Sequence, residues 1–251
     1  MTDLHTHVLP HLDDGAKDEA TARALLQAEV EQGVKNIVLT PHFYGKRHSP
    51  AQFLEKRNKI FEKIKADIPQ NLQVRLGAEV HFTGINVPKY SELCKLAIEG
   101  TKYILLELPF TSKWTYELTS ILAEFVEETE YTPIIAHVER YHEVLKNPAL
   151  VTDFVEMGCL IQVNAEAFIN ALSRKFAFAL MRHGLVHCLG SDTHDLELRV
   201  PNLAEAKAIV DEAGYTQEWE QAQTIMQQIL AGEKVKIPAY SPVKKFLGRY
   251  K

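Results

Sequence analysis

Asp3-Leu4-His5-Thr6-His7, close to the start of the chain, carries two histidines that are separated by one residue. It lies in a short apolar run, for which we predict a strand over residues 2–7. Alternate side chains of a strand point to the same face, so His5 and His7 converge on one point. That geometry suits two ligands of one metal ion. The same pattern, a short apolar run that ends near a histidine or a carboxylate, returns along the chain.

Short apolar runs alternate with amphipathic segments of helix length. Strands are predicted over residues 2–7, 36–40, 72–77, 103–107, 132–136, 160–164 and 187–190, and helices over 16–32, 50–66, 87–98, 116–128, 142–157 and 165–182. This alternation is typical of parallel strands covered by helices. In 251 residues it predicts one domain, a closed or nearly closed β/α barrel, with a solvated basic tail at about residues 244–251. An open doubly wound sheet is the alternative, but the sequence has no glycine-rich nucleotide loop.

Candidate metal ligands lie at or just after the ends of the predicted strands. They are five imidazoles and four carboxylates: His5, His7, Asp14, His42, Glu79, Glu107, His137, Asp192 and His194. The carboxyl ends of all strands of a β/α barrel surround one mouth, so these nine side chains are expected to line one depression there, called the bowl below. Each residue alone is more often a structural hydrogen-bond or ion-pair partner, and only their recurrence indicates a site. Asp13 is an alternative to Asp14. Structural roles are expected for the remaining histidines, which are His11, His48, His81, His142, His183 and His187.

Four carboxylates in one bowl would repel one another, and their pKa values would rise. Two or three divalent cations remove this repulsion, and three would leave a local charge of about +2, which suits a phosphate dianion. Imidazole and carboxylate ligands without thiolate favour manganese, iron or zinc in a catalytic centre. Such ions can also activate a hydroxide to attack phosphorus.

These motifs resemble the polymerase-and-histidinol-phosphatase (PHP) superfamily. The matching segments are Asp3–His7, Thr40-Pro41-His42, Gly77-Ala78-Glu79, Ala136-His137 and Ser191-Asp192-Thr193-His194. The turn Leu12-Asp13-Asp14-Gly15 and the ending Gly190–His194 are similar to one branch of it, the bacterial protein-tyrosine phosphatases of capsule and exopolysaccharide operons (the CpsB/CapC class). The likeness extends from Met1 to about Leu203.

The resemblance implies a distorted seven-stranded β/α barrel of the PHP type and a trinuclear site that usually holds manganese, with iron or zinc possible. The first ion would be held by His5, His7, Glu79 and Asp192, the second by Glu79, Glu107 and His137, and the third by Asp14, His42 and His194. The resemblance also favours Asp14 over Asp13. Arg140 and Arg199 match arginines implicated in phosphate handling in this branch, and a planar guanidinium can bind two phosphate oxygens. The alternative for both arginines is a surface ion pair.

We predict hydrolysis of protein phosphotyrosine by a metal-activated hydroxide, without a covalent intermediate. A thiolate mechanism is excluded, because Cys94, Cys159 and Cys188 all lack the arginine that a Cys-x5-Arg phosphatase loop requires. The competing functions are a phosphatase of the histidinol-phosphate type, a PHP exonuclease or phosphodiesterase, and an inactive binding module. A formal charge of −5 argues mildly against nucleic acid as a partner. Residues 43–48, basic and aromatic, either recognise the phosphotyrosyl ring or form an ordinary solvated loop.

The resemblance further implies a role in the regulation of capsule or exopolysaccharide biosynthesis, with a bacterial tyrosine autokinase as the phosphotyrosyl partner. An oligomer is possible. No apolar run reaches the ~18 residues that span a bilayer. Cleavage of an N-terminal leader would remove His5 and His7, so we expect a cytoplasmic protein. The scattered cysteines agree with a reducing compartment.

Overall fold

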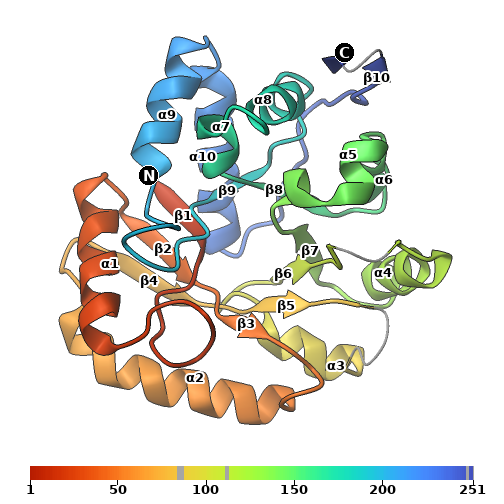
Figure 1. Cartoon of the computed structure of the whole chain (residues 1–251). Coiled ribbons are helices and arrows are strands. Elements are labelled where there is room, and N and C mark those ends of the chain that lie inside the picture. Colours follow the sequence, from red (N-terminus) through yellow and green to blue (C-terminus); the bar gives the residue numbers. More distant parts are fainter. Residues whose placement is uncertain (84–87, 111–112, 247–248, 251) are drawn as a thin grey trace.

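The strands β1 to β9 lie at the centre of the molecule and the helices surround them (Figure 1). The structure, a computed structural model, describes residues 1–83, 88–110, 113–246 and 249–250. A three-stranded parallel sheet has the order β1 (Thr2–Thr6), β2 (Asn36–Leu39) and β4 (Gln73–Leu76). A six-stranded parallel sheet has the order β3 (His42–Phe43), β5 (Glu79–His81), β6 (Tyr103–Glu107), β7 (Thr132–Ile135), β8 (Leu160–Asn164) and β9 (Cys188–Gly190). The fold is thus a curled, parallel α/β arrangement.

The predicted count of seven strands is not confirmed, because two short strands, β3 and β5, were not expected. β3 follows β2 after Thr40-Pro41, and β5 follows β4 after Gly77-Ala78. Pro41 has no N–H to donate to a ladder, which accounts for an interruption at this point. The Pro41 carbonyl still accepts the Glu79 N–H at 3.1 Å. Backbone bonding therefore continues past the interruption and holds β5 in place.

The two sheets meet where β1 lies beside the end of β9. The His7 N–H donates to the Thr193 carbonyl, and the Asp192 N–H donates to the His5 carbonyl, each at 2.9 Å. Gly190 permits this approach, since a Cβ at that position would lie 2.5 Å from the Cβ of His5. The contact brings the first and last candidate ligands of the sequence together.

The helices cover the outside of the sheets. They are α1 (Glu19–Glu31), α2 (Pro50–Ile64), α3 (Tyr90–Leu93), α4 (Tyr116–Glu128), α5 (His142–Lys146), α6 (Leu150–Glu156), α7 (Glu166–Ile169), α8 (Arg174–Arg182), α9 (Leu203–Glu212) and α10 (Thr216–Leu230), with short 3₁₀ turns at Lys65–Asp67, Cys94–Leu96 and Val138–Arg140. α2 begins at a capping box: the Ser49 hydroxyl accepts the Gln52 N–H at 3.3 Å, and the Gln52 side chain accepts the Ser49 N–H at 3.1 Å. None of the described helices is long and apolar enough to cross a membrane.

Several predicted helices are shorter or divided. The predicted helix 142–157 is split into α5 and α6 at Asn147-Pro148, because Pro148 has no N–H to donate to the helix and its ring disfavours a helical conformation at Asn147. The predicted helix 165–182 is likewise split into α7 and α8. Of the predicted helix 87–98, α3 and a 3₁₀ turn cover residues 90–96, and residue 87 lies outside the described residues. α4 has the predicted bounds.

The end of the chain is more ordered than the sequence indicates. No helix was predicted beyond residue 190, yet α10 packs against β1 and β9 and buries Trp219 completely. The solvated basic tail stays a prediction; Lys244 and Lys245 in its described part are exposed. β10 (Lys245–Phe246) pairs with β11 (Arg249–Tyr250), and the Tyr250 ring lies 4.8 Å from that of Phe176 on α8. An aromatic contact of this kind holds the tail against the body of the protein.

Candidate metal centre

All nine candidate ligands lie at the same end of the strands. β1 carries His5 and leads into His7, β3 and β5 begin at His42 and Glu79, and β6 ends at Glu107. The others follow β7 and β9 or lie in the loop after β1: His137, Asp192, His194 and Asp14. Their ligand atoms form four overlapping groups, and within each group these atoms lie within 4.8 Å of one another. The convergence expected from the strand ends is therefore observed.

Glu79 is the carboxylate around which the imidazoles gather. Its Oε2 lies 3.2 Å from His5 Nε2, 3.3 Å from His7 Nε2 and 2.8 Å from His42 Nδ1. Its Oε1 lies 2.7 Å from His137 Nε2. Burial opposes ionisation of this fully buried side chain, but the surrounding imidazoles outweigh burial and keep the Glu79 pKa well below its ordinary value. Glu79 is thus a buried carboxylate with both oxygens turned toward nitrogen ligands.

His5 and His7 face one another across a very small space. Their Nε2 atoms are 3.0 Å apart, and Asp192 Oδ1 lies 3.6 Å from the first and 3.4 Å from the second. Both imidazoles and this carboxylate are buried. At most one of the two nitrogens can donate a proton to the other, so the remaining lone pairs point into the same space.

A second group of candidate ligands lies on the more exposed side of the bowl. Asp14 Oδ1 lies 3.4 Å from His42 Nε2 and 3.5 Å from His194 Nε2, while the Asp14 side chain is 65% exposed. The His194 ring also stacks on that of His7, with centroids 3.9 Å apart. This group is therefore joined to the buried one through His7.

Glu107 completes the set on the side of β6. Its Oε1 lies 3.9 Å from His137 Nε2, and it groups with His42 and Glu79. The other oxygen, Oε2, lies 2.9 Å from Nδ1 of His81. His81 was expected to be merely structural, yet it holds a candidate ligand in place.

The donor set fits divalent metal ions. Glu79 Oε2, Asp192 Oδ1 and His194 Nε2 are buried atoms that make no hydrogen bond within the described residues. Glu79 Oε2 and Asp192 Oδ1 have nitrogen atoms nearby, but these ion pairs lack hydrogen-bond geometry, and leaving buried polar atoms without a hydrogen bond is costly. A cation bound between them would satisfy these acceptors at once, and imidazole with carboxylate is a common ligand combination for manganese, iron and zinc.

Two candidate ligands occupy backbone conformations that residues other than glycine rarely adopt. His137 has φ of 31° and Asp192 has φ of 55°. Left-handed conformations of this kind cost free energy, and they gather at functional sites, where the surrounding structure enforces them. Here the conformations turn both side chains from the strand ends into the bowl.

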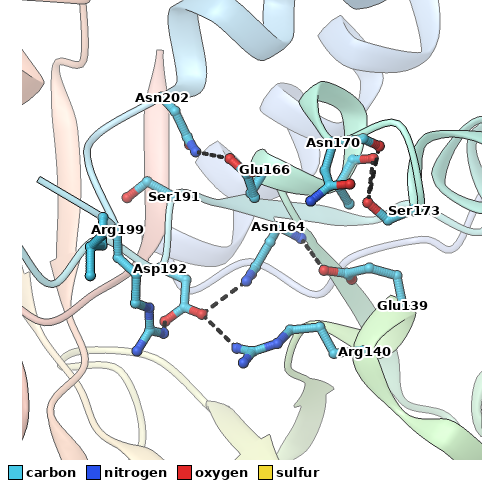
Figure 2. A pocket seen from close by; sticks show the side chains of 12 residues that line it. Glu139, Arg140, Asn164, Glu166, Asn170, Ser173, Ser191, Asp192, Arg199 and Asn202 are labelled. Atoms are coloured by element: carbon cyan, nitrogen blue, oxygen red, sulfur yellow. Dashed lines mark hydrogen bonds and ion pairs between the residues drawn. The ribbon is translucent and has the colours of Figure 1, made fainter.

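Arg140 and Arg199 flank Asp192. The Arg140 Nη1 donates to Asp192 Oδ2 at 3.1 Å, and the guanidinium lies 4.9 Å from the centroid of the Phe110 ring. Arg199 Nη2 lies 2.7 Å from Asp192 Oδ1, and its Nη1 lies 3.8 Å from Asp14 Oδ2. Both guanidinium groups therefore reach the candidate ligands, and they add positive charge at the edge of the bowl. Figure 2 shows them on either side of the carboxylate.

The family comparison decides the relationship of this chain. A family model described as "Capsular polysaccharide synthesis, CpsB/CapC" matches residues 1–230. This chain belongs to the CpsB/CapC family. Tyrosine-protein phosphatase YwqE of Bacillus subtilis is 32% identical to it over 217 residues, which is 84% of either chain. Tyrosine-protein phosphatase CpsB of Streptococcus agalactiae is 29% identical over 219 residues, 84% of this chain and 89% of the relative.

Solved structures show the same relationship. The crystal structures of YwqE from Bacillus subtilis and CpsB from Streptococcus pneumoniae, described as unique metal-dependent tyrosine phosphatases, include a chain with a TM-score of 0.82 and 28% identity. The match covers 98% of this chain and 100% of that one. Histidinol phosphate phosphatase of Lactococcus lactis, solved with zinc, histidinol and phosphate, matches at a TM-score of 0.53 and 14% identity over 85% of this chain and 93% of that one. The second likeness shows the fold alone.

Two residues of this CpsB/CapC chain that were not predicted, Gln162 and Asn164 on β8, also contact the candidate ligands. Gln162 Oε1 accepts the backbone N–H of His137 at 2.7 Å and lies 3.2 Å from His5 Nδ1. Its Nε2 donates to Asn164 Oδ1 at 2.8 Å, and Asn164 Nδ2 donates to Asp192 Oδ2 at 2.9 Å. β8 thus contributes no candidate ligand but fixes three of them. Two buried amides at alternate positions of a strand are the only sequence signal for this role.

Asp13, the alternative to Asp14, lies beside the bowl in a supporting position. Its Oδ2 is 2.7 Å from His7 Nδ1 and accepts the His42 N–H at 2.9 Å. Burial opposes its ionisation, but His7 and the two backbone donors His42 and Gly15 lower the Asp13 pKa to about 2. A carboxylate behind a ring nitrogen sets the orientation of the imidazole and the position of its proton.

Residues 43–48 do not act as one unit. Phe43 is buried and packs on Phe53, whereas residues 45–48 are exposed. Tyr44 is half-buried, with its ring centroid 5.4 Å from His42 and 5.3 Å from His81. Tyr44 therefore lies beside the candidate ligand His42, with the Arg47 guanidinium 4.7 Å from its ring centroid, and the part of this segment in recognising a phosphotyrosyl ring stays a prediction.

Proposed function

We propose that this protein is a manganese-dependent protein-tyrosine phosphatase with a trinuclear centre. The observation that carries the proposal is the convergence of nine imidazole and carboxylate groups, Glu79 among them, with two arginines beside them, in a chain of the CpsB/CapC family. The relatives at 32% and 29% identity are named tyrosine-protein phosphatases. The family description supports a role in capsular polysaccharide synthesis. The histidinol-phosphatase alternative has only a shared fold in its support.

The ligands divide among three ions as the resemblance implies. His5, His7, Glu79 and Asp192 would hold the first, Glu79, Glu107 and His137 the second, and Asp14, His42 and His194 the third. The overlap of the observed groups at Glu79, His5, His7 and His42 supports neighbouring ions that share ligands. The fold would be a seven-stranded barrel of the PHP type if each interrupted pair, β2 with β3 and β4 with β5, is counted as one strand.

Bound metal ions would supply positive charge and a water activated for attack on phosphorus. The chain itself binds and orients the phosphate. Arg140 and Arg199 present their guanidinium groups beside Asp192, where they can hold phosphate oxygens and stabilise the charge that develops during transfer. The tyrosine leaving group has a pKa near ~10, so it departs with little help from a general acid.

Phosphate release from a phosphotyrosyl peptide tests this function. Protein stripped by a chelator is expected to be inactive, because the site would lose its activated water and most of its positive charge. Added Mn²⁺ is expected to restore turnover, and histidinol phosphate is expected to be a poorer substrate. Hydrolysis of histidinol phosphate alone, or equal activity in the stripped protein, would reject the proposal.

The Gln162→Leu variant is expected to bind manganese about 10- to 100-fold more weakly. Leucine cannot accept a hydrogen bond from His5 Nδ1 or from the His137 N–H, so both candidate ligands lose a contact that orients them. The measurement is a metal titration of stripped protein. Gln223→Leu is the matched control. The buried Gln223 amide bonds to the backbone of Thr2, which lies on β1 as His5 does, but Gln223 lies away from the bowl. Equal affinities of the two variants would remove Gln162 from this role.

The expected partner is a bacterial tyrosine autokinase, which would supply the phosphotyrosyl protein. We also propose a single domain over residues 1–251, a cytoplasmic location, and a possible oligomer, as the sequence predicted. Nucleic acid is not proposed as a substrate, because the net charge of −5 disfavours it.

A further inference from the structure

A polar pocket of about 320 Å³ opens beside the candidate metal centre. Asp192, Arg140 and Arg199 line it on the side of the bowl, so the pocket begins where a phosphate would bind. β8, α7 and the segments before α8 and α9 form the rest, through Asn164, Glu166, Asn170, Ser173 and Asn202 (Figure 2). The proposed hydrolysis of phosphotyrosine assigns no role to this far side.

The far side of the pocket offers oxygen acceptors. Asn202 Nδ2 donates to Glu166 Oε2 at 3.2 Å, which fixes the orientation of the amide and leaves Asn202 Oδ1 as an acceptor. That oxygen is buried and, within the described part of the chain, has no hydrogen-bond partner. Glu139 also lines the pocket, and its buried Oε2 likewise has no hydrogen-bond partner within the described residues. Buried polar atoms of this kind require a partner, and here a ligand that donates hydrogen bonds would supply it.

Other polar groups of the pocket are already satisfied. Asn164 accepts from Gln162 and donates to Asp192, and the Ser173 hydroxyl donates to the carbonyl of Ala167 at 3.1 Å. On the far side of the pocket, the buried atoms that lack a hydrogen-bond partner within the described residues are therefore Asn202 Oδ1 and Glu139 Oε2, and the exposed Glu166 lies beside Asn202. Burial raises the pKa of Glu139 to about 8, so its carboxyl is largely protonated near neutral pH. Glu166 is therefore the acidic group of the far side that favours a cationic donor over a neutral one.

The rim of the pocket is apolar. Leu198 lines it and is 90% exposed, while Leu172, between the lining residues Asn170 and Ser173, is 94% exposed. Large exposed apolar side chains beside a pocket favour contact with a partner. An apolar rim above an acceptor-rich wall is complementary to a long side chain with an aliphatic stem and a charged head.

We infer that the pocket binds a lysine or arginine side chain that lies within two residues of the phosphotyrosine in the substrate protein. This inference rests on the proposed phosphatase function. The phosphate would meet Arg140 and Arg199, and the basic head would pass beyond them to Glu166 and Asn202. The pocket thereby selects the sequence around the phosphotyrosine, whereas the bowl selects the phosphate.

The test compares phosphotyrosyl peptides that differ at one residue, with lysine, alanine or glutamate at each of the two positions on either side of the tyrosine. At one position we expect lysine to raise kcat/KM about tenfold over alanine, as a charge-assisted hydrogen bond does, and glutamate to lower it. The Glu166→Gln variant is expected to lose most of the lysine preference. Glu156→Gln, the same change at the end of α6 before β8, is the control and should keep it.

Free phosphotyrosine is assayed in parallel, because it cannot reach the far side of the pocket. Its hydrolysis together with equal rates on all peptides, or with a preference for glutamate, would overturn the inference and leave the phosphatase function in place. An unchanged lysine preference in Glu166→Gln would also overturn it. No hydrolysis of free phosphotyrosine or of any peptide by manganese-loaded protein would instead overturn the proposed function.

Discussion

Replacing Glu79 by glutamine is expected to lower both manganese affinity and phosphotyrosine turnover by more than about 100-fold, which exceeds the usual effect of a residue behind the ligands. Glu79 is fully buried and lies within 3.3 Å of nitrogen atoms of four imidazoles. The amide retains the shape of the side chain but removes its negative charge and one acceptor oxygen. A bridging ligand would therefore be lost while the surrounding packing is preserved. Metal content after dialysis and kcat/KM on one peptide are the two measurements.

Glu29→Gln provides the matched control. Glu29 is equally buried, and burial together with the neighbouring Asp3 raises its pKa well above the ordinary value. Glu29 belongs to none of the candidate ligand groups, so an amide there should leave metal binding and turnover close to those of the wild type. Wild-type metal content and turnover in Glu79→Gln would contradict the central position of Glu79.

Replacing Arg199 by alanine is expected to lower kcat/KM by about 10²–10³-fold, as the loss of one group that stabilises transition-state charge does. The guanidinium lies 2.7 Å from Asp192 at the edge of the bowl. Its backbone carbonyl, which accepts from Thr193 Oγ1 and the His194 N–H, is retained in the variant, so the ligand loop keeps its shape. Metal affinity should therefore change far less than turnover.

Two further variants separate this role from simple loss of charge. Arg199→Lys keeps the charge but loses the planar fork, and we expect activity between those of alanine and the wild type. Arg23→Ala removes an arginine that pairs with Asp67 on the helical exterior and should leave activity unchanged. An Arg199→Ala variant with wild-type kcat/KM would show that the phosphate is held without this residue.

The candidate site could be predicted from the sequence because ligands follow strand ends. His5, His42, Glu79 and His137 are separated widely along the chain, yet parallel strands bring their carboxyl ends to one edge. The short apolar runs of the sequence indicate the strands, and the strand ends then predict where the ligands meet. Residues that hold the ligands in place cannot be predicted in this way, because they do not follow strand ends. Gln162, for example, lies within a buried strand, and its contact with His5 depends on how β8 is placed beside β9 and β1.

The limits of the fold prediction have local causes. Pro41 interrupts a strand and Pro148 interrupts a helix, although the apolar pattern continues past both residues. Periodicity reports which side of an element is buried and does not report where its hydrogen bonds stop. The pocket beside Asp192 is beyond sequence reasoning for a related reason, since its wall joins Glu139, Glu166 and Asn202 from three separate segments.

Titration of manganese into stripped protein, with bound metal and phosphotyrosine hydrolysis measured on the same samples, tests whether the candidate ligands form a catalytic trinuclear centre. If the convergent side chains form one trinuclear centre, activity should rise with bound metal and reach its maximum at about three ions per chain. Full activity in a chain that carries no ion, or a maximum at a single ion, would contradict it.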